Sequence, residues 1–489
     1  MPAARPPVSR LADTRLFDRL ERLRPLTEPL TRAFAAAGQS LYLVGGPVRD
    51  AILGLEADDL DFTTSARPDQ IEALLRGFGG PIWDMGRQFG TIGTLLTTAG
   101  AQWRVEVTTF RADAYVPQSR KPDVQFGDTI EHDLIRRDFT VNAMAVDLIE
   151  RRFVDPFHGL ADLEAAVLRT PAAAEQSFSD DPLRMMRAAR FTARFGLRPT
   201  PDVVKAMLDL KDRLAIVSAE RVRDELSKLL LTDHPRVGLD LLVRTGLAEV
   251  FLPELPALRL EIDEHHRHKD VYEHSLTVLE RAIDLEKARH HDPDIVIRLA
   301  ALLHDIGKPK TRRFEAGGRV SFHHHDVVGA KLARRRLTAL KYPNDVIESV
   351  AELIDLHLRF HGYGEADWTD SAVRRYVRDA GGELERLHIV TRADCTTRNK
   401  AKADRLARAY EELEWRIDAL AEQEELDAIR PDLDGHQIMA VLGIGPGRAV
   451  GQAYSFLLER RLDRGPVAPE QATAELVQWW AGRQADGTD

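Results

Sequence analysis

Several features are scarce in this sequence, and each scarcity excludes a class of protein. There is one cysteine, Cys395, so no internal disulfide can form and a reducing compartment, the cytoplasm, is expected. No apolar run approaches the roughly 18 residues of a membrane span, so no membrane partner is expected. The first residues have no apolar signal-peptide core. Basic residues are also comparatively few, since 68 lysines and arginines stand against 78 acidic residues.

The resulting net charge of −10 does not exclude a nucleic-acid partner, because the charge is unevenly distributed. Between residues 184 and 223, ten lysines and arginines stand against four acidic residues. Binding a phosphate backbone requires a local surplus of this kind. With 489 residues the chain should form several domains, since single cores stop growing near roughly 250–300 residues.

The stretch from residue 41 to residue 64 organises the first half of the chain. Residues 41–44 predict a short strand, a Gly-Gly turn follows, and the next helix ends at Gly54, a residue suited to a C-terminal cap. A second strand is expected to carry Asp59 and Asp61. Because strand side chains alternate, both carboxylates point to one face.

Two neighbouring carboxylates repel each other unless a hard cation lies between them. Mg²⁺ binds one or two carboxylates together with substrate phosphates, and the glycine turn opens a helix N-terminus whose amides suit a triphosphate. The alternative is an ordinary strand-turn-helix followed by an aspartate-rich surface loop. On a further predicted strand, residues 103–109, Glu106 is either a third metal ligand or only a neighbour.

Residues 136–144, RRDFTVNAM, form a second motif. On a strand, apolar and polar side chains would alternate between faces, with Asp138, Thr140 and Asn142 on the polar one. Such a face can recognise a ribose, and Arg137 can pair with a phosphate. The alternative is a half-buried strand with a polar outer face.

A third motif, in residues 177–191, predicts a helix capped by Ser179 or Asp180. Arginines step along one side of it at spacings of three, four and four. These arginines are Arg187, Arg190, Arg194 and Arg198. There is an alternative explanation for the two aspartates at the start of this helix. Acidic residues at a helix N-terminus complement the helix dipole, and Asp181 could form a simple ion pair with Arg184.

In their order and spacing, GGxxRDxxLG, DxDFTT and RRDFTxNAM resemble the signatures of the polymerase-β-like nucleotidyltransferases. They are similar to the class II branch, which holds tRNA CCA-adding enzymes and bacterial poly(A) polymerases, and the resemblance runs from about residue 38 onward. It implies that Asp59 and Asp61 are catalytic and hold Mg²⁺. The nucleotide contacts that it implies are Gly45, Gly46, Arg49, Arg137, Asp138 and Asn142.

The sequence DDPLR resembles the family's EDxxR motif, by which the protein itself reads the incoming base. Cytosine and adenine both present an amino donor beside a ring-nitrogen acceptor, which the carboxylate of Asp181 and the guanidinium of Arg184 complement. Uracil and guanine present a carbonyl and a ring N–H there. Asp180 stands where the family usually has Glu, which leaves its supporting role open.

The resemblance extends to the arginines and to the segment that follows them. It implies that Arg187 and Arg190 contact nucleotide and that Arg194 and Arg198 bind RNA. Residues 220–226, ERVRDEL, resemble a further motif of the neck region, for which the sequence alone suggests no mechanism beyond a solvated charged helix face.

A second set of chemical groups lies beyond residue 270. A lone histidine on an apolar helix face usually packs in a core, but this ordered set resembles the HD phosphohydrolase superfamily, which holds one or two metals that activate water. Of the adjacent histidines 323–325, the last fits the family spacing because Gly-Ala follows it. The implied ligands are His274, His304, Asp305, His325, His357 and Asp394. Imidazole ligands favour Ni²⁺ or Mn²⁺.

We therefore predict an α+β protein. A small polymerase-β-like nucleotidyltransferase head, with a mixed β-sheet and helices, precedes an elongated all-α body that includes an HD domain. The predicted divisions are a tail and helix (1–37), the head (38–168), a helical neck that reads the base and binds RNA (169–258), the HD domain (259–400) and a C-terminal helical body (401–489).

The predicted function is template-independent addition of CCA to the 3′ end of tRNA from CTP and ATP, with release of pyrophosphate. The expected partners are the tRNA acceptor end and both nucleotides, and no DNA. An additional HD phosphohydrolase activity is expected. The alternatives are a poly(A) polymerase, an enzyme that adds only CC or only A, and a protein that is mainly an HD nucleotide phosphohydrolase. The oligomeric state stays open.

Overall fold

The computed structural model describes residues 9–56, 59–98, 100–111, 126–260, 270–315, 320–360, 368–396, 399–424 and 429–485. By its internal contacts the chain divides into two compact units, Met1–Pro253 and Glu254–Asp489. Among the described helices, none is long and apolar enough to cross a membrane.

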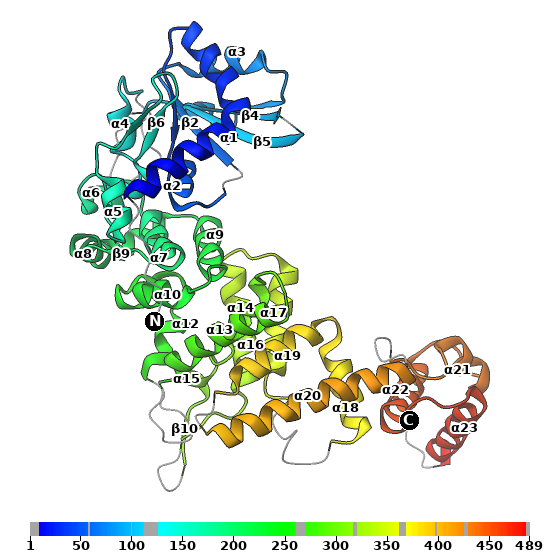
Figure 1. Cartoon of the computed structure of the whole chain (residues 1–489). Coiled ribbons are helices and arrows are strands. Elements are labelled where there is room, and N and C mark those ends of the chain that lie inside the picture. The colour runs from blue at the N-terminus through cyan, green and yellow to red at the C-terminus, as the bar shows by residue number, and fades with distance from the viewer. Residues whose placement is uncertain are drawn as a thin grey trace. The chain divides into compact units, whose positions relative to one another are not determined.

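The first unit contains a seven-stranded sheet with the strand order β3-β4-β5-β2-β1-β6-β7 (Figure 1). The sheet is mixed, because β2 and β5 run parallel whereas β1 pairs antiparallel with both β2 and β6. Its strands are β1 (Leu41–Val44), β2 (Asp59–Thr64), β3 (Ile82–Trp83), β4 (Thr91–Thr98), β5 (Ala101–Thr109), β6 (Ala145–Asp147) and β7 (Arg152–Val154).

Two helices flank the strand that precedes the glycine turn. Helix α2 (Gly46–Leu53) ends at Gly54, whose φ of 74° is left-handed, as the sequence predicts. Helix α1 (Ser9–Ala36) lies against the sheet (Figure 1). A proline inside a helix removes one backbone hydrogen bond, yet α1 runs through both Pro25 and Pro29. Burial of its apolar face, including Leu30, offsets the lost backbone hydrogen bonds.

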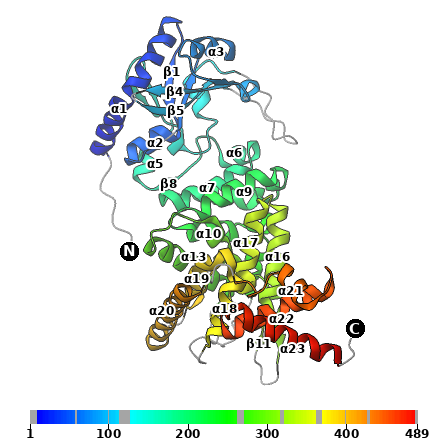
Figure 2. The same cartoon turned by 90° about the vertical axis from the view of Figure 1, so that its right-hand side faces the viewer.

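Helices complete the first unit. They are α3 (Pro68–Arg76), α4 (Ile130–Leu134), α5 (Gly159–Glu164), α6 (Ala174–Asp180), α7 (Leu183–Phe195), α8 (Pro201–Leu210), α9 (Ala219–Leu230), α10 (Pro235–Arg244) and α11 (Leu247–Phe251), with 3-10 turns η1 (Arg87–Phe89), η2 (Thr140–Asn142) and η3 (Lys211–Ile216). A minimal parallel pair joins β8 (Val167–Leu168) to β9 (Arg198–Pro199). Helix α7 packs against both α9 and α10 (Figure 2).

The second unit is built mainly from helices. They are α12 (Glu254–Ala257), α13 (Val271–Ala288), α14 (Ile295–Leu303), α15 (Lys308–Thr311), α16 (His325–Ala339), α17 (Asn344–Leu356), α18 (Asp370–Ala380), α19 (Leu384–Asp394), α20 (Lys400–Gln423), α21 (Gly435–Leu442), α22 (Arg448–Arg464) and α23 (Pro469–Ala485), with 3-10 turns η4 (Leu258–Leu260) and η5 (Gly381–Glu383). A short hairpin pairs β10 (Arg313–Phe314) with β11 (Val320–Ser321).

Two helical cores organise this unit. Helix α13 packs on α14 and α19, while α17 packs on α14 and α16. The last three helices close a separate core around Leu433, Ile438, Leu457 and Leu476. The predicted fold class, a mixed-sheet head followed by a helical body, is thereby confirmed.

Candidate active site and metal centre

The paired carboxylates lie on β2, as the strand alternation predicts. Asp59 and Asp61 are exposed, whereas Leu60 and Phe62 between and beside them are buried. In the parallel register with β5, Asp61 stands opposite Glu106. The structure therefore brings three carboxylates to one face at the sheet centre.

The environment of these carboxylates favours a cation. Desolvation raises the pKa of Asp61, the Arg137 guanidinium opposes that rise, and the charges of Glu106 and Asp59 reinforce it. Glu106 is paired with Arg104 at 2.8 Å. Among the described residues, the groups of three or more ligand atoms lying within 4.8 Å of one another belong to the second unit. A role for Glu106 as a third ligand of the Asp59–Asp61 pair stays a prediction.

The glycine turn approaches the second motif closely. Gly45 has a φ of 74°, and a Cβ built there would lie 2.7 Å from a terminal nitrogen of Arg137. Its amide donates to the carbonyl of Met144 at 3.1 Å. Arg137 in turn donates to Asp133 at 3.0 Å. Glycine is thus needed for the backbone angle, whereas a larger residue would only displace the end of the Arg137 side chain. The turn therefore begins α2 next to the Arg137 guanidinium.

Arg49, on α2, is held inside the protein. Its guanidinium donates to the carboxylate of Asp50 at 2.8 Å and also to the side-chain carbonyl of Asn142. It lies 4.3 Å from the ring centre of Phe195. Only 5% of the residue is exposed. Its contact with a triphosphate stays a prediction, and the visible role of Arg49 is to tie α2 to the Asn142 loop and α7.

The strand predicted for residues 138–144 is wrong. Residues 140–142 form a 3-10 turn, and the whole segment is buried on all sides. Its polar side chains bind one another and the local backbone, because Asp138 accepts from the Phe139 amide and the Asn142 side chain, both at 2.9 Å. Thr140 donates to Asp162 at 2.7 Å. These local hydrogen bonds replace a strand ladder.

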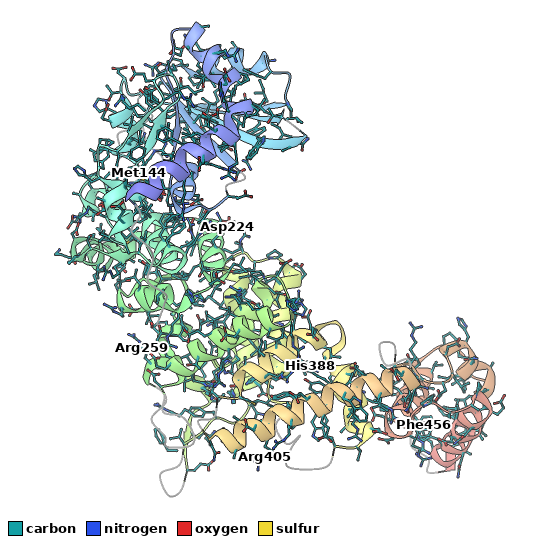
Figure 3. All side chains as sticks on the ribbon, viewed as in Figure 1. Met144, Asp224, Arg259, His388, Arg405 and Phe456 are labelled. Carbon is teal, nitrogen blue, oxygen red and sulfur yellow. The ribbon has the colours of Figure 1, made fainter. Side chains whose placement is uncertain are left out.

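A network of charges, of which Asp138, Arg190 and Glu225 are buried and Arg187 is half-buried, joins this loop to the helices. Asp138 accepts from Arg187 of α7 at 2.6 and 2.7 Å. Arg190, one turn later, donates to Glu225 of α9 at 2.6 Å, and Glu225 lies 3.9 Å from Arg187. Although burial opposes it, the Arg187 charge, Asn142 and Arg184 hold the pKa of Asp138 at about 2. In Figure 3 the labels Met144, two residues after Asn142, and Asp224, next to Glu225, mark the two segments that this network joins.

The proposed base-reading pair lies at the junction of α6 and α7. Asp181 accepts from the Leu183 amide through Oδ1 and from Arg221 through Oδ2, both at 3.1 Å. Arg184 is buried and donates to the Ser177 hydroxyl at 2.8 Å. Asp181 therefore pairs with Arg221 of α9 and not with Arg184, so the simple ion pair considered above is not formed.

Two further expectations about α7 are corrected. Neither Ser179 nor Asp180 caps it, because both end α6, and Asp180 accepts from Gln176 at 2.6 Å. The arginine row also stops earlier than its spacing predicts. Gly196, with a φ of 67°, ends the helix, so Arg198 lies on β9, where it donates to the carbonyl of Ala165.

The two ends of that arginine row differ in burial. Arg187 and Arg190 are engaged by acids within the protein, whereas Arg194 and Arg198 are exposed. Arg194 lies 5.0 Å from the ring centre of Phe195. The exposed pair is free of carboxylate partners among the described ion pairs, and its binding of RNA stays a prediction.

All six histidine and aspartate residues proposed as metal ligands meet in the second unit. They come from helix ends: His274 lies in the first turn of α13, His325 begins α16, His304 and Asp305 follow α14, His357 follows α17, and Asp394 ends α19. The atoms that bind metal converge. His274 Nε2 lies 2.9 Å from Asp394 Oδ1, His304 Nε2 lies 3.2 Å from Asp305 Oδ2, and His325 Nε2 lies 3.3 Å from Asp305 Oδ1.

The orientation of three of these rings is fixed by the backbone. In His304, His325 and His357 the Nδ1 atom faces the carbonyl oxygen three residues earlier, at 2.9, 2.8 and 2.5 Å. A carbonyl only accepts, so Nδ1 carries the proton and Nε2 of the neutral ring is left as a ligand. The Nε2 atom of His357 is buried with no hydrogen-bond partner among the described residues.

Charge in this cluster also fits a cation. Although burial opposes it, Asp305 and Asp394 raise the pKa of His304 to about 10. Burial and the His304 charge lower the pKa of His357 to about 4. Without a metal ion, a protonated His304 and Lys308, which lies 2.9 Å from Asp305, balance the carboxylates, while His357 stays neutral. A metal ion held by groups such as Asp305, His325 and His357 would take the place of the His304 proton and use the unpartnered Nε2 of His357.

One glycine allows the cluster to close. A Cβ at Gly307 would lie 2.0 Å from the carbonyl oxygen of His325. The segment after Asp305 therefore packs directly on the start of α16, which selects His325 from its neighbours. His323 by contrast lies at the surface, 3.3 Å from Glu315.

Sequence reasoning missed the partners that hold these sites. Arg221 and Glu225 belong to the ERVRDEL segment, whose motif was visible although its role was not. Ser177 accepts from Arg184, and the Nζ atom of Lys308 lies 2.9 Å from Asp305 Oδ2. Nothing in the sequence pointed to these two residues except their positions inside motifs.

The mixed sheet with a glycine turn beside paired carboxylates defines a nucleotidyltransferase head, and the histidine–aspartate cluster defines an HD domain. Family models match the same segments. The Poly A polymerase head domain matches residues 41–169, the "Probable RNA and SrmB- binding site of polymerase A" matches residues 196–258, and the HD domain matches residues 271–399.

Relatives extend the match to nearly the whole chain. The A-adding tRNA nucleotidyltransferase of Deinococcus radiodurans is 35% identical over 448 residues, which are 90% of this chain and 95% of the relative. The CC-adding tRNA nucleotidyltransferase of Thermus thermophilus is 31% identical over 457 residues, 91% and 95% of the two chains. The crystal structure of the Bacillus stearothermophilus CCA-adding enzyme in complex with CTP aligns with a TM-score of 0.64 at 25% identity, covering 95% of this chain and 99% of that one. The chain belongs to the family of tRNA nucleotidyltransferases and bacterial poly(A) polymerases.

Asp138→Asn should weaken the first unit in a pH-dependent way. The folded pKa of about 2 lies below the ordinary 3.8, so the carboxylate contributes stability above pH 4 that is lost as the pH falls through 2. Its contribution is about 2 kcal/mol at pH 7 and about 1 kcal/mol at pH 3.

Denaturant unfolding of both proteins at pH 7 and pH 3 measures this difference. The advantage of the wild type should shrink by about half. Asp69→Asn, which removes a highly exposed carboxylate from the same unit, serves as the control and should show little difference at either pH. An advantage of the wild type over Asp138→Asn that stays constant across this range would contradict the charge network.

Proposed function

We propose that this protein is a tRNA nucleotidyltransferase that adds C, C and A to the 3′ end of tRNA. The tRNA 3′-hydroxyl attacks the α-phosphorus of CTP or ATP, a new phosphodiester forms, and pyrophosphate leaves with the electrons of the broken bond. The observation that carries the proposal is the pair of carboxylates on β2 beside the glycine turn, with a rigidly held Asp181 and Arg184 at the start of α7.

The chain's own residues would divide the work. Asp59 and Asp61 would hold Mg²⁺, which neutralises the triphosphate and lowers the pKa of the attacking hydroxyl when bound. The Gly46 amide and the Arg137 guanidinium would contact the triphosphate, whereas the Gly45 amide already donates to the Met144 carbonyl and Gly45 would serve by shaping the turn. Asp138 and Asn142, fixed by their mutual hydrogen bond, would position the sugar.

Base choice would come from protein groups, which is why no template is needed. One oxygen of Asp181 would accept from the exocyclic amino group of cytosine or adenine, while Arg184 would donate to the adjacent ring nitrogen. Both side chains are already fixed by neighbouring groups, so their geometry is set before a nucleotide arrives.

Partial addition is the main alternative, because the relatives of Deinococcus and Thermus are named for adding only A and only CC. Poly(A) addition is a further alternative. The shared chemistry of cytosine and adenine at the Asp181–Arg184 pair favours an enzyme that accepts both nucleotides. The finer domain limits given above and a cytoplasmic location are part of this proposal.

Removing either strand carboxylate should abolish nucleotide addition. Purified Asp59→Asn and Asp61→Asn are incubated with Mg²⁺, labelled CTP or ATP, and tRNA that ends before the CCA, and products are separated on a gel. Addition should fall by at least about 10³-fold, because the ion that stabilises the transition state is lost. The melting temperature should hardly change, since removing like-charge repulsion does not cost stability.

Asp69→Asn, which also removes a carboxylate from the head, is the matched control and should keep wild-type activity. Retained addition in either β2 variant would remove that residue from the mechanism.

We also propose that the HD cluster is a separate metal-dependent phosphohydrolase site. The convergence of imidazole Nε2 atoms on the buried Asp305 carboxylate and the half-buried Asp394 carboxylate supports this second function. Six such ligands suit Ni²⁺ or Mn²⁺ better than Mg²⁺, because Mg²⁺ prefers oxygen ligands and its own waters. A bound metal would supply an activated water for attack on a phosphate ester.

The double variant His304→Ala, Asp305→Ala should lose Ni²⁺- or Mn²⁺-dependent hydrolysis of phosphomonoesters and 2′,3′-cyclic phosphates, because it removes two ligands and a charge from the cluster. CCA addition should stay within a few-fold of the wild type, since the Asp59–Asp61 pair belongs to the other unit. Both activities are measured on one preparation. If addition falls together with hydrolysis while the protein stays folded, the two sites are not independent.

A further inference from the structure

The indole of Trp83 lies on the same face of the sheet as the Asp59–Asp61 pair, and the proposed mechanism gives it no role. We propose that Trp83 is the platform on which the 3′-terminal base of the tRNA stacks while its 3′-hydroxyl attacks the incoming nucleotide. The inference rests on the proposed function, because it assigns a place to the second substrate of the same reaction.

The strand register places Trp83 on this face. Asp61 of β2 stands opposite Glu106 of β5, and Glu106 stands opposite Gly93 of β4. Gly93 in turn stands opposite Trp83 of β3. Residues directly opposite each other on neighbouring strands share a face of the sheet. One row of residues therefore crosses four strands, from the proposed catalytic carboxylates to the indole.

The indole is held in one place at the end of this row. A Cβ built on Gly93 would overlap Nε1 and Cε2 of Trp83, so the ring lies directly against the backbone of β4. The Trp83 side chain is partly exposed on the edge strand of the sheet. Arg104, which pairs with Glu106 at 2.8 Å, places its guanidinium 5.5 Å from the ring centre. An aromatic ring beside a cation is the combination that binds single-stranded RNA.

The direction of the reaction selects the substrate that reaches this ring. The glycine turn at Gly45 and Gly46 follows β1, and β1 and β5 flank β2 on opposite sides. In phosphoryl transfer the attacking and leaving oxygens are roughly in line. Pyrophosphate leaves on the β1 side, so the 3′-hydroxyl approaches from the β5 side. The nucleotide that carries this hydroxyl therefore lies over β5 and β4.

The spacing of the strands suits one nucleotide. Neighbouring strands are about 4.8 Å apart, so β4, which the indole covers, lies about 10 Å from β2. A ribose and its base bridge this gap when the 3′-hydroxyl reaches the Asp59–Asp61 pair. The terminal base of the tRNA can therefore reach the ring of Trp83 during the attack.

Stacking also suits a base that changes during the reaction. The terminal base is first that of the unfinished tRNA and then a cytosine after each addition of C. Hydrogen bonds to one base edge would reject the others, whereas every base offers a π-face to an aromatic ring. The platform thus accepts each terminal base in turn, while the Asp181–Arg184 pair reads the incoming one.

The test combines a change in the protein with a change in the RNA. Two tRNAs ending before the CCA are compared, one intact and one whose last nucleotide keeps its ribose and 3′-hydroxyl but lacks its base. The proteins are the wild type, Trp83→Ala, Trp83→Phe and the control Met85→Ala, which removes a side chain that is 85% exposed in the same segment. kcat/KM for each tRNA is measured at saturating CTP, and KM for CTP is measured on the intact tRNA.

We expect the wild type to prefer the intact tRNA by about 5- to 50-fold, because the missing base removes the stack. Trp83→Ala should show less than about a twofold preference, since the ring and the base contribute only together. Trp83→Phe should keep most of the preference, and Met85→Ala all of it. KM for CTP should stay within about twofold in every variant. A partial loss of folded protein lowers both rates equally and cancels in the ratio.

A preference in Trp83→Ala as large as that of the wild type would overturn the inference, as would a wild type indifferent to the missing base. A raised KM for CTP with an unchanged preference would also overturn it, because the ring would then hold the incoming base. If the wild type adds neither C nor A to the intact tRNA, the proposed function fails. If it adds both while Trp83→Ala keeps the preference, only the role of Trp83 fails.

Discussion

The ion pairs among Asp138, Arg187, Arg190 and Glu225 are the interaction on which the first unit depends. Asp138, Arg190 and Glu225 are buried, and a buried charge without a partner would cost several kcal/mol, so these three require their partners, which include the half-buried Arg187. The network joins three separate elements, the loop after β5 and α4, helix α7, and helix α9. Because these elements would contact sugar, base and RNA, one set of ion pairs fixes the parts of the nucleotide site relative to one another.

The second unit solves a similar problem with a different outcome. Its charges also converge, but the Asp305 and Asp394 carboxylates meet histidines, and the Nε2 atom of His357 has no hydrogen-bond partner among the described residues. Where arginines pair with the acids of the first unit, imidazole and carboxylate groups able to bind a metal ion converge in the second. Converging charge therefore organises a rigid ion-pair network in one unit and a candidate metal centre in the other.

The sequence was most informative where side-chain alternation or an ordered motif acts locally. It predicted β1, the shared face of Asp59 and Asp61, and the cap at Gly54, because these depend on neighbours in the chain. It failed at residues 138–144, where Asp138 and Asn142 satisfy each other and no strand is needed, and at Arg198, because Gly196 ends the helix first. The partners of Arg221 and Arg190 were beyond reach, since many acids compete for each arginine and only tertiary packing selects among them.

The central claim is that Glu225 couples α7 to the loop at residues 138–144, and hydrogen exchange measures this coupling directly. Amide exchange is followed by mass spectrometry in the wild type, in Glu225→Gln, and in Glu249→Gln, a control that removes the exposed partner of Lys211. In Glu225→Gln we expect faster exchange in both α7 and residues 138–144, because Arg187 and Arg190 lose their shared anion. Faster exchange confined to α9, with residues 138–144 as protected as in the wild type, would contradict the claim.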